Sequence, residues 1–284
     1  TQLEASYPEA AKDPYTVLLL HFNEASGSTR IKDYASTTRV ITASGNASTT
    51  NAVTQLGLGN SLALDGTGDY LRVGAAADWK FLHGAEDTTG FKWSYSEWVK
   101  IDSFASRNVL LATGYNVNNA RLELTIETDR AFRTGIVNAS EGAIVSFNSG
   151  SIKYPNDSNW HYLTFTYDQS LSSNNMKWYL DGVLIAVATK TANTPSTGDP
   201  QHTLSIGEQA GQAWTFNGKR DEIQILNGRA LTPEEIKAAA SRRPYAVYTS
   251  PVVDAAASVR WDTVNWTEGG VNTGNGEQPY NTSS

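Results

Sequence analysis

Hydrophobic and polar residues alternate along much of the chain in short runs that end at glycine, aspartate or asparagine. The segments 91–101 (FKWSYSEWVKI) and 160–168 (WHYLTFTYD) repeat every second residue, which is the period of a β-strand with one buried face. Residues 16–22 (TVLLLHF) form a continuous apolar run of strand length, typical of a strand that is buried on both faces. The pattern therefore predicts strands at these three places.

A hairpin is predicted within residues 176–190 (MKWYLDGVLIAVATK). Asp181 and Gly182 separate its two apolar runs, and this dipeptide favours a type I′ turn because both of its positions need positive φ. Further short strand patterns lie at 61–73, between 108 and 147, at 202–208 and at 220–226. About a dozen short strands, each closed by turn residues, indicate a β-sandwich or jelly roll rather than βαβ units.

One helix is well signalled, directly after the last of these strands. Thr232 is the expected N-cap, Pro233 the first helical residue and Glu235 the partner that completes a capping box. Leu231 and Ile236 are spaced as a hydrophobic staple, and the helix is expected to end before Pro244. We therefore expect an N-terminal tail at 1–13, a jelly roll at 14–240, and a β-rich C-terminal extension or the start of a further module at 241–284.

Composition removes several classes of function. The net charge of −7 gives no basic patch for nucleic acid or anionic membranes, and no apolar run is long enough to span a bilayer. The chain has no cysteine, which rules out disulfides, thiol catalysis and cysteine zinc sites. We expect neither nucleic-acid binding nor membrane insertion.

Six segments together resemble the laminin G-like group of the concanavalin A-like lectin/glucanase superfamily. They are 18–24 (LLLHFNE), 61–73 (SLALDGTGDYLRV), 97–101 (EWVKI), 159–168 (NWHYLTFTYD), 176–186 (MKWYLDGVLIA) and 218–236 (GKRDEIQIL to ALTPEEI). The resemblance implies an all-β fold, a two-sheet antiparallel jelly-roll sandwich, here with one short C-terminal helix and a β-rich C-terminal extension.

Carboxylates are the first candidate for chemistry. Glucanases of this superfamily carry Glu-x-Asp-x-Glu on one strand, and this chain has Glu123, Thr125 and Glu127, so the central acid is missing. Positions i and i+4 of a strand lie about 13 Å apart, whereas glycoside hydrolysis needs carboxyl groups roughly 5–9.5 Å apart. We therefore expect a half-exposed strand with these three side chains outward, and structural roles for His21 and His161.

A calcium site is the second candidate, and it rests on the resemblance. Many jelly rolls of this superfamily hold a structural Ca²⁺ near the rim, and the matching positions here are Asp221, Asn23 and Gly68. Calcium takes six to eight oxygen ligands, many of them carbonyls or water, so one carboxylate can suffice. The alternative is that Asp221 only caps the turn before its strand. Glu222 is expected to face solvent.

Aromatic side chains are the third candidate, because they stack on sugar rings. Trp93, Trp160 and Trp178 lie on strand patterns, where packing between the sheets is expected. Trp214, between Gly211 and Asn217, has a loop-like setting and is expected to be exposed. It is the one candidate for glycan binding.

The resemblance implies a non-catalytic extracellular protein on a cell or virion surface, with a lectin-like jelly roll that binds a glycan or a surface protein. One alternative is a structural subunit of an extracellular filament or virion, and another is a glycan-active hydrolase or lyase. Residues 245–284 retain strand-like patterns and need a surface to pair with. They either fold back along their own sandwich or mediate self-assembly with a neighbouring copy.

Overall fold

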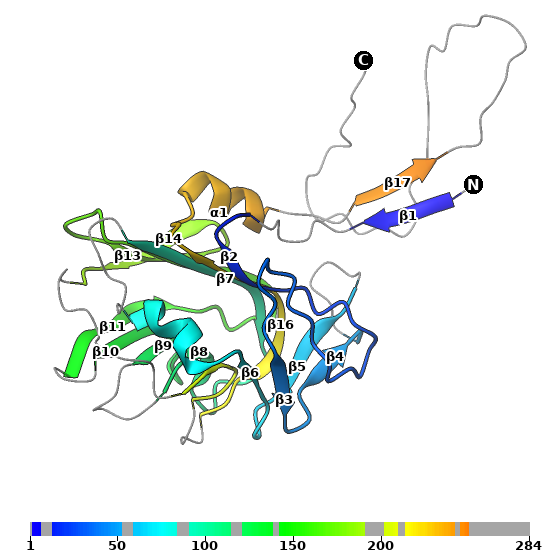
Figure 1. The fold of residues 1–284 in the computed structure, drawn as a ribbon, viewed down its shortest axis with the longest axis horizontal. Coiled ribbons are helices and arrows are strands. Elements are labelled where there is room, and N and C mark those ends of the chain that lie inside the picture. Colours follow the sequence, from blue (N-terminus) through cyan, green and yellow to red (C-terminus); the bar gives the residue numbers. More distant parts are fainter. Residues whose placement is uncertain are drawn as a thin grey trace, which may run out of the picture. The chain divides into compact units, whose positions relative to one another are not determined.

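The computed structural model describes residues 2–6, 13–52, 59–83, 91–114, 121–138, 142–190, 202–209, 214–241 and 245–249. For residues 2–6, 137–138, 142–146 and 245–249 only the backbone is described. Two antiparallel sheets form a sandwich, which confirms the predicted jelly-roll fold (Figure 1).

The first sheet has seven strands. In spatial order they are β11 (Gly142–Lys153), β10 (Ala131–Asn138), β9 (Arg121–Ile126), β8 (Asn108–Ala112), β15 (Leu204–Ile206), β6 (Tyr70–Val73) and β3 (Ile41–Ser44). Strand β15 joins strands from distant parts of the chain, because it pairs with β8 on one side and with β6 on the other.

The second sheet has eight strands. In spatial order they are β14 (Val183–Ala188), β13 (Met176–Leu180), β12 (His161–Asp168), β7 (Lys92–Ile101), β16 (Asn217–Asn227), β5 (Ser61–Asp65) and β4 (Ser48–Thr50), with β2 (Thr16–Leu20) beside β16. The first half of β16 pairs with β5 and its second half pairs with β2.

The core lies between the two sheets and follows the predicted alternation. Trp93, Phe165 and Trp178 are fully buried; the Phe165 ring is tilted against Trp93 at 5.0 Å and meets Trp178 edge to face at 5.2 Å, measured between ring centroids. A 3₁₀-helix, η1 (Ala76–His83), adds Trp79, whose indole nitrogen donates to the Val73 carbonyl at 2.7 Å. The prediction for Trp160 was wrong, because it precedes β12 and packs against a second, smaller cluster.

That smaller cluster lies beneath helix α1 (Pro233–Ala240) on the outer face of the eight-stranded sheet. The capping box of Thr232 and Glu235 is present, and Leu231 and Ile236 both belong to the cluster, as the staple predicted. The helix is followed by Ser241 as its C-cap, three residues before Pro244. Asp181 and Gly182 both have positive φ, which confirms the predicted hairpin turn.

A further sheet has two strands, β1 (Gln2–Ser6) and β17 (Tyr245–Thr249). Residues 2–6, within the segment predicted as an N-terminal tail, thus form a strand, and the strand expected after the helix is confirmed for residues 245–249. The other strand expected in the extension lies outside the described residues. Among the helices that the structure describes, none has the length and apolar character needed to cross a membrane.

Candidate functional site

Five residues line up across the outer face of the seven-stranded sheet. Strand pairing places Gly135 opposite Glu123, Glu123 opposite Ala112, Ala112 opposite Ser205, and Ser205 opposite Arg72. We call these five residues the polar row. Paired residues of neighbouring strands share a face, and strands lie about 4.8 Å apart, so the row extends for roughly 19 Å.

Glu123 is the acid of this row and is held from two sides. Its Oε2 accepts from the Gln209 side-chain amide at 2.7 Å, and its Oε1 lies 3.0 Å from the Arg133 guanidinium. A Cβ at Gly135 would come within 2.6 Å of Oε1, so only glycine leaves room for the carboxylate. Glu123 is 2 % exposed, so the prediction of a half-exposed strand was wrong. The predicted inward face of β9 is confirmed, because Leu122, Leu124 and Ile126 all belong to the core between the sheets.

Glu127, directly after the same strand, is hydrogen-bonded to Arg107 and lies 3.8 Å from Arg133, the arginine that also binds Glu123. Its Oε2 accepts from the Arg107 guanidinium at 3.0 Å, and its Oε1 accepts from the Thr125 hydroxyl at 3.1 Å. The Arg107 guanidinium lies 4.0 Å from the centre of the Trp214 ring, a cation–π contact. Trp214 is therefore half-buried rather than fully exposed as predicted, and the structure brings it next to the predicted carboxylates.

Three polar atoms at this site are buried without a hydrogen-bond partner in the described part of the chain. They are Arg72 Nη1, Ser205 Oγ and Gln209 Oε1. The other ends of two of these side chains are engaged, because Arg72 Nη2 binds Glu208 at 2.7 Å and Gln209 Nε2 binds Glu123. A buried polar atom without a partner costs roughly 1–3 kcal/mol, so these atoms mark a place where a ligand or a water molecule can supply the missing hydrogen bonds.

Burial shifts two titratable groups near Arg72. It raises the pKa of Glu208, although the Arg72 guanidinium opposes that shift. Burial and the Arg72 charge both lower the pKa of His202. At neutral pH His202 is therefore uncharged, and the charged groups at this end of the polar row are Arg72 and its ion-pair partner Glu208, 2.7 Å away.

Sequence reasoning missed Arg72, Ser205 and Gln209. Each lies in a different short segment, and none belongs to a recognisable motif. Gln209 is separated from its partner Glu123 by 86 residues. The outward position of Ser205 in β15 was the one available signal, and it does not distinguish a site from an ordinary surface serine.

Asp221 and Glu222 lie at a bulge in β16. Asp221 pairs with Trp98 and Gln224 with Ser96, so β16 has one extra residue here, and Glu222 has a φ of +52°. The Asp221 carboxylate accepts from the Glu222 amide at 2.9 Å, which is a local cap of the bulge. Glu222 was expected to face solvent, but it is 8 % exposed and lies 2.9 Å from Nδ1 of His21.

The other two predicted calcium ligands lie at different ends of β5. Asn23 accepts from the Asn60 amide at 3.5 Å, just before β5, which is the end near Asp221. Gly68 follows the opposite end, where Asp65 pairs with Asn217. Asn217 is four residues before Asp221, a distance of about 13 Å along a strand. Gly68 therefore does not fit the predicted ligand set, and calcium binding at Asp221 and Asn23 stays a prediction.

His161 is buried and hydrogen-bonded, as expected of a structural histidine. Its Nδ1 lies 2.6 Å from Asp181, and its Nε2 lies 3.1 Å from Asp157. Burial disfavours the charged imidazolium, but the hydrogen bonds to Asp181 and Asp157 outweigh it and raise the pKa of His161.

Solved structures with the same fold include binding modules. The binding domain of botulinum neurotoxin serotype D has a TM-score of 0.55 and 15% identity, over 80% of this chain and 51% of that chain. Domain 4 of AbnA, a GH43 extracellular arabinanase from Geobacillus stearothermophilus, was solved with arabinotriose; it has a TM-score of 0.52 and 18% identity, over 80% of this chain and 98% of that chain. This chain thus spans about half the length of the toxin domains and nearly all of the arabinanase domain.

A search of curated proteins found no match to this sequence. A family model described as the concanavalin A-like lectin/glucanases superfamily matches residues 65–237, which is more than half of the chain. That region contains most strands of the sandwich, the bulge at Asp221 and the whole polar row. The chain therefore belongs to the concanavalin A-like lectin/glucanase superfamily.

Proposed function

We propose that the protein is a non-catalytic glycan-binding module whose binding site is the polar row with Trp214. The observation that carries this proposal is the set of three buried, unpartnered polar atoms on Arg72, Ser205 and Gln209. They include a donor, a hydroxyl that both donates and accepts, and an acceptor. A sugar presents neighbouring hydroxyl groups that also donate and accept, so a short oligosaccharide along the row offers a matching group to each atom.

The surroundings of these atoms support a sugar over other small ligands. Trp214 supplies an aromatic ring at the edge of the site, and aromatic rings pack on the C–H faces of sugars. The length of the row, roughly 19 Å, suits a short oligosaccharide rather than a single unit. The arabinanase domain, which was solved with arabinotriose, shares this fold and supports the same ligand class.

The carboxylates of the site argue against hydrolysis. Glu123 is bound by Arg133 and Gln209, and Glu127 is bound by Arg107. Glycoside hydrolysis requires one carboxyl group that is protonated and free to reach the glycosidic oxygen. Two carboxylates that are neutralised by arginine serve better to hold the arginine side chains in place. We further propose that the protein is extracellular, on a cell or virion surface, where a glycan-binding module meets its ligands.

Binding to a panel of oligosaccharides, including arabinan fragments, tests this proposal. We expect at least one neutral oligosaccharide to bind without release of sugar. Ser205→Ala should weaken that binding by about fivefold, because it removes a hydrogen bond worth roughly 1 kcal/mol and leaves a ligand hydroxyl unpaired. Trp214→Ala should weaken it by a similar factor.

Thr164→Val is the matched control, because Thr164 Oγ1 is also buried, has no partner among the described residues and lies in the eight-stranded sheet. It should leave oligosaccharide binding unchanged. Binding that survives both Ser205→Ala and Trp214→Ala would place the site elsewhere. Sugar release that is lost in Glu123→Gln and Glu127→Gln would instead identify a hydrolase.

A second role, self-assembly, is favoured by the two-stranded sheet of β1 and β17. A pair of strands is marginally stable by itself and offers two edges to further strands. We propose that residues 245–284 recruit a neighbouring copy or the next module at such an edge. Deletion of 245–284 should then leave a folded monomer in sedimentation experiments, whereas a full-length protein that stays monomeric at high concentration would contradict assembly.

A further inference from the structure

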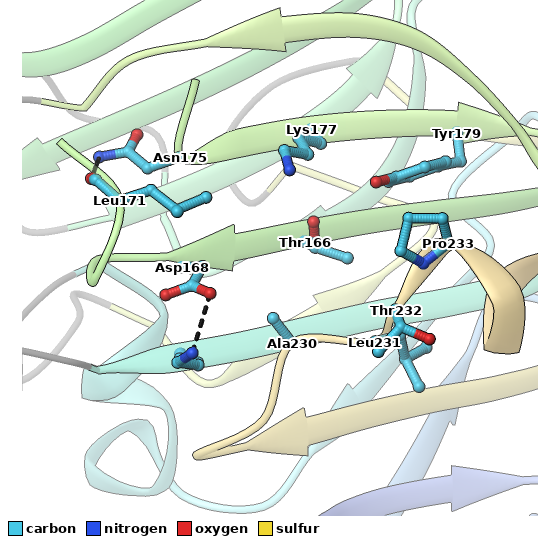
Figure 2. A pocket seen from close by; sticks show the side chains of 11 residues that line it. Thr166, Asp168, Leu171, Asn175, Lys177, Tyr179, Ala230, Leu231, Thr232 and Pro233 are labelled. Atoms are coloured by element: carbon cyan, nitrogen blue, oxygen red, sulfur yellow. Dashed lines mark hydrogen bonds and ion pairs between the residues drawn. The ribbon is translucent and has the colours of Figure 1, made fainter. Parts of the chain in front are cut away.

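A pocket lies on the opposite side of the sandwich from the polar row, on the outer face of the eight-stranded sheet. It has a volume of about 260 Å³ and lies between the segment 230–233, which leads into α1, and the turn between β12 and β13 (Figure 2). Pockets for drug-sized ligands measure roughly 300–1,000 Å³. This pocket therefore suits one sugar-sized unit.

Both walls of the pocket are held in place by hydrogen bonds. On one side, Ser94 accepts from the Leu231 amide at 2.8 Å and donates to the Arg229 carbonyl at 2.8 Å. On the other side, the Asn175 side chain donates to the carbonyls of Leu171 and Lys190, at 3.4 and 2.8 Å. The pocket is thus preformed, which lowers the entropic cost of binding.

Three polar groups converge on the floor without a partner in the part of the chain that the structure describes. Thr166 and Lys177 lie directly opposite each other on β12 and β13, and Tyr179 follows Lys177 on the same face. Figure 2 shows the Lys177 amine, the Tyr179 hydroxyl and the Thr166 hydroxyl turned toward the same space. None of them has a hydrogen bond or ion pair with these described residues.

Of the two lysines that line the pocket, one is paired with a carboxylate and the other has no carboxylate partner in the segments that the structure describes. Lys92 is neutralised by Asp168, whose Oδ2 lies 2.9 Å from its amine, and the other Asp168 oxygen accepts from Ser170. Lys177 has no such counterion among the described residues. Burial raises the pKa of the Tyr179 phenol, and the charge of Glu234, in the first turn of α1, raises it further. The free charge at the floor is therefore the Lys177 ammonium, beside two hydroxyl groups.

We infer that this pocket binds a single acidic sugar unit, with its carboxylate on Lys177 and its hydroxyls on Thr166 and Tyr179. The side chains of Leu171 and Pro233 give the pocket apolar walls for the C–H face of the ring. This site is distinct from the polar row, because the two lie on opposite outer faces of the sandwich. It extends the proposed function from neutral to acidic saccharides.

An NMR titration of the intact protein with D-glucuronate, glucose and acetate tests this inference. Glucuronate should shift the backbone amides of Thr166, Lys177, Tyr179 and Leu231 at millimolar concentration, while glucose and acetate should bind at least about tenfold more weakly, because each offers only part of the polar contacts. Lys177→Gln should abolish the glucuronate response and Lys177→Arg should retain most of it. Tyr179→Phe should weaken binding by about threefold to tenfold.

Lys237→Gln is the charge-matched control, since Lys237 is exposed on α1, about 6 Å along the helix from Pro233, and does not line the pocket. It should bind glucuronate normally, as should Ser205→Ala, which affects only the polar row. An equal response to acetate would reduce the site to an adventitious ion only. Equal losses in Lys177→Gln and Lys237→Gln, or no shifts at the floor, would also overturn the inference.

Discussion

Two buried polar clusters in this sandwich differ in how completely their hydrogen bonds are made. Between the sheets, the fully buried Arg220 donates to Glu97 at 2.7 Å, to the Tyr95 hydroxyl at 2.9 Å and to the Leu110 carbonyl at 2.9 Å. On the outer face, the polar row and its neighbour Gln209 have three buried atoms without a partner among the residues that the structure describes. A complete hydrogen-bond network stabilises one arrangement of the chain. Unpaired buried atoms reduce the stability of the free protein, and they contribute to ligand binding when a ligand supplies the missing hydrogen bonds.

The largest expected effect comes from breaking the completed cluster with Arg220→Met. Glu97 would keep a buried carboxylate without its guanidinium, and such losses cost about 3–5 kcal/mol. Urea unfolding monitored by tryptophan fluorescence measures this change. Glu97→Leu together with Arg220→Met should be less destabilising than Arg220→Met alone, because no charge is then left unpaired. A loss below about 1 kcal/mol for Arg220→Met would show that the ion pair matters no more than a surface pair.

Removal of divalent cations tests the remaining calcium prediction at Asp221. A ligand that binds only the folded state stabilises it by about 2.7 kcal/mol at a hundred times its Kd. If calcium is bound there, refolding in chelator lowers the melting temperature, and Asp221→Ala removes that response. Because Asp221 also caps the bulge, Asp221→Ala lowers stability in either case, so only the response to chelator is diagnostic. An unchanged melting curve after refolding in chelator contradicts calcium binding.

His161 is an intermediate case, because its network is complete but its two aspartates are partly exposed. Its pKa is raised in the folded state, so its stabilising contribution is complete below about pH 6.5 and is lost as pH rises through the folded pKa. The difference in unfolding free energy between the wild type and His161→Gln should therefore shrink toward alkaline pH.

The pKa of His202 is shifted in the opposite direction from that of His161, so His202 provides a control. Its pKa is lowered by burial and by Arg72, so the unfolded chain takes up the proton first and stability falls as pH decreases below about 6.5. His202→Gln should reduce that acid sensitivity. Parallel pH profiles for the two variants would contradict the assignment of opposite shifts.

The smallest effect should come from Ser205→Ala, and it should be stabilising. The Ser205 hydroxyl has no partner in the described residues, so its removal relieves a desolvation cost of about 1 kcal/mol without breaking a bond. Thr134→Val is the matched comparison, because the Thr134 hydroxyl accepts from the Trp178 indole at 2.8 Å. The melting temperature should rise for the first variant and fall for the second. A change in the same direction for both would remove the distinction between unpaired and paired buried hydroxyl groups.

Local features of this protein were determined by the sequence itself. The alternation in 91–101 and 160–168 required strands with one face in a core, because the strand period is two residues. Asp181 and Gly182 specified a hairpin, and Thr232, Pro233 and Glu235 specified the start of the helix. Each of these depends on residues within a few positions of one another, so the local pattern was sufficient.

The site was decided by tertiary structure, since its members meet only through the pairing of distant strands. Glu97 lies on the apolar face of β7 and is tolerated there because Arg220, 123 residues later, reaches it from β16. Glu222 is buried because a bulge in β16 turns it toward His21 of the first apolar run. The polar row exists because β15 lies between β8 and β6. The order of the strands in each sheet determines which of these residues are neighbours, and that order cannot be predicted from the spacing of residues along the chain.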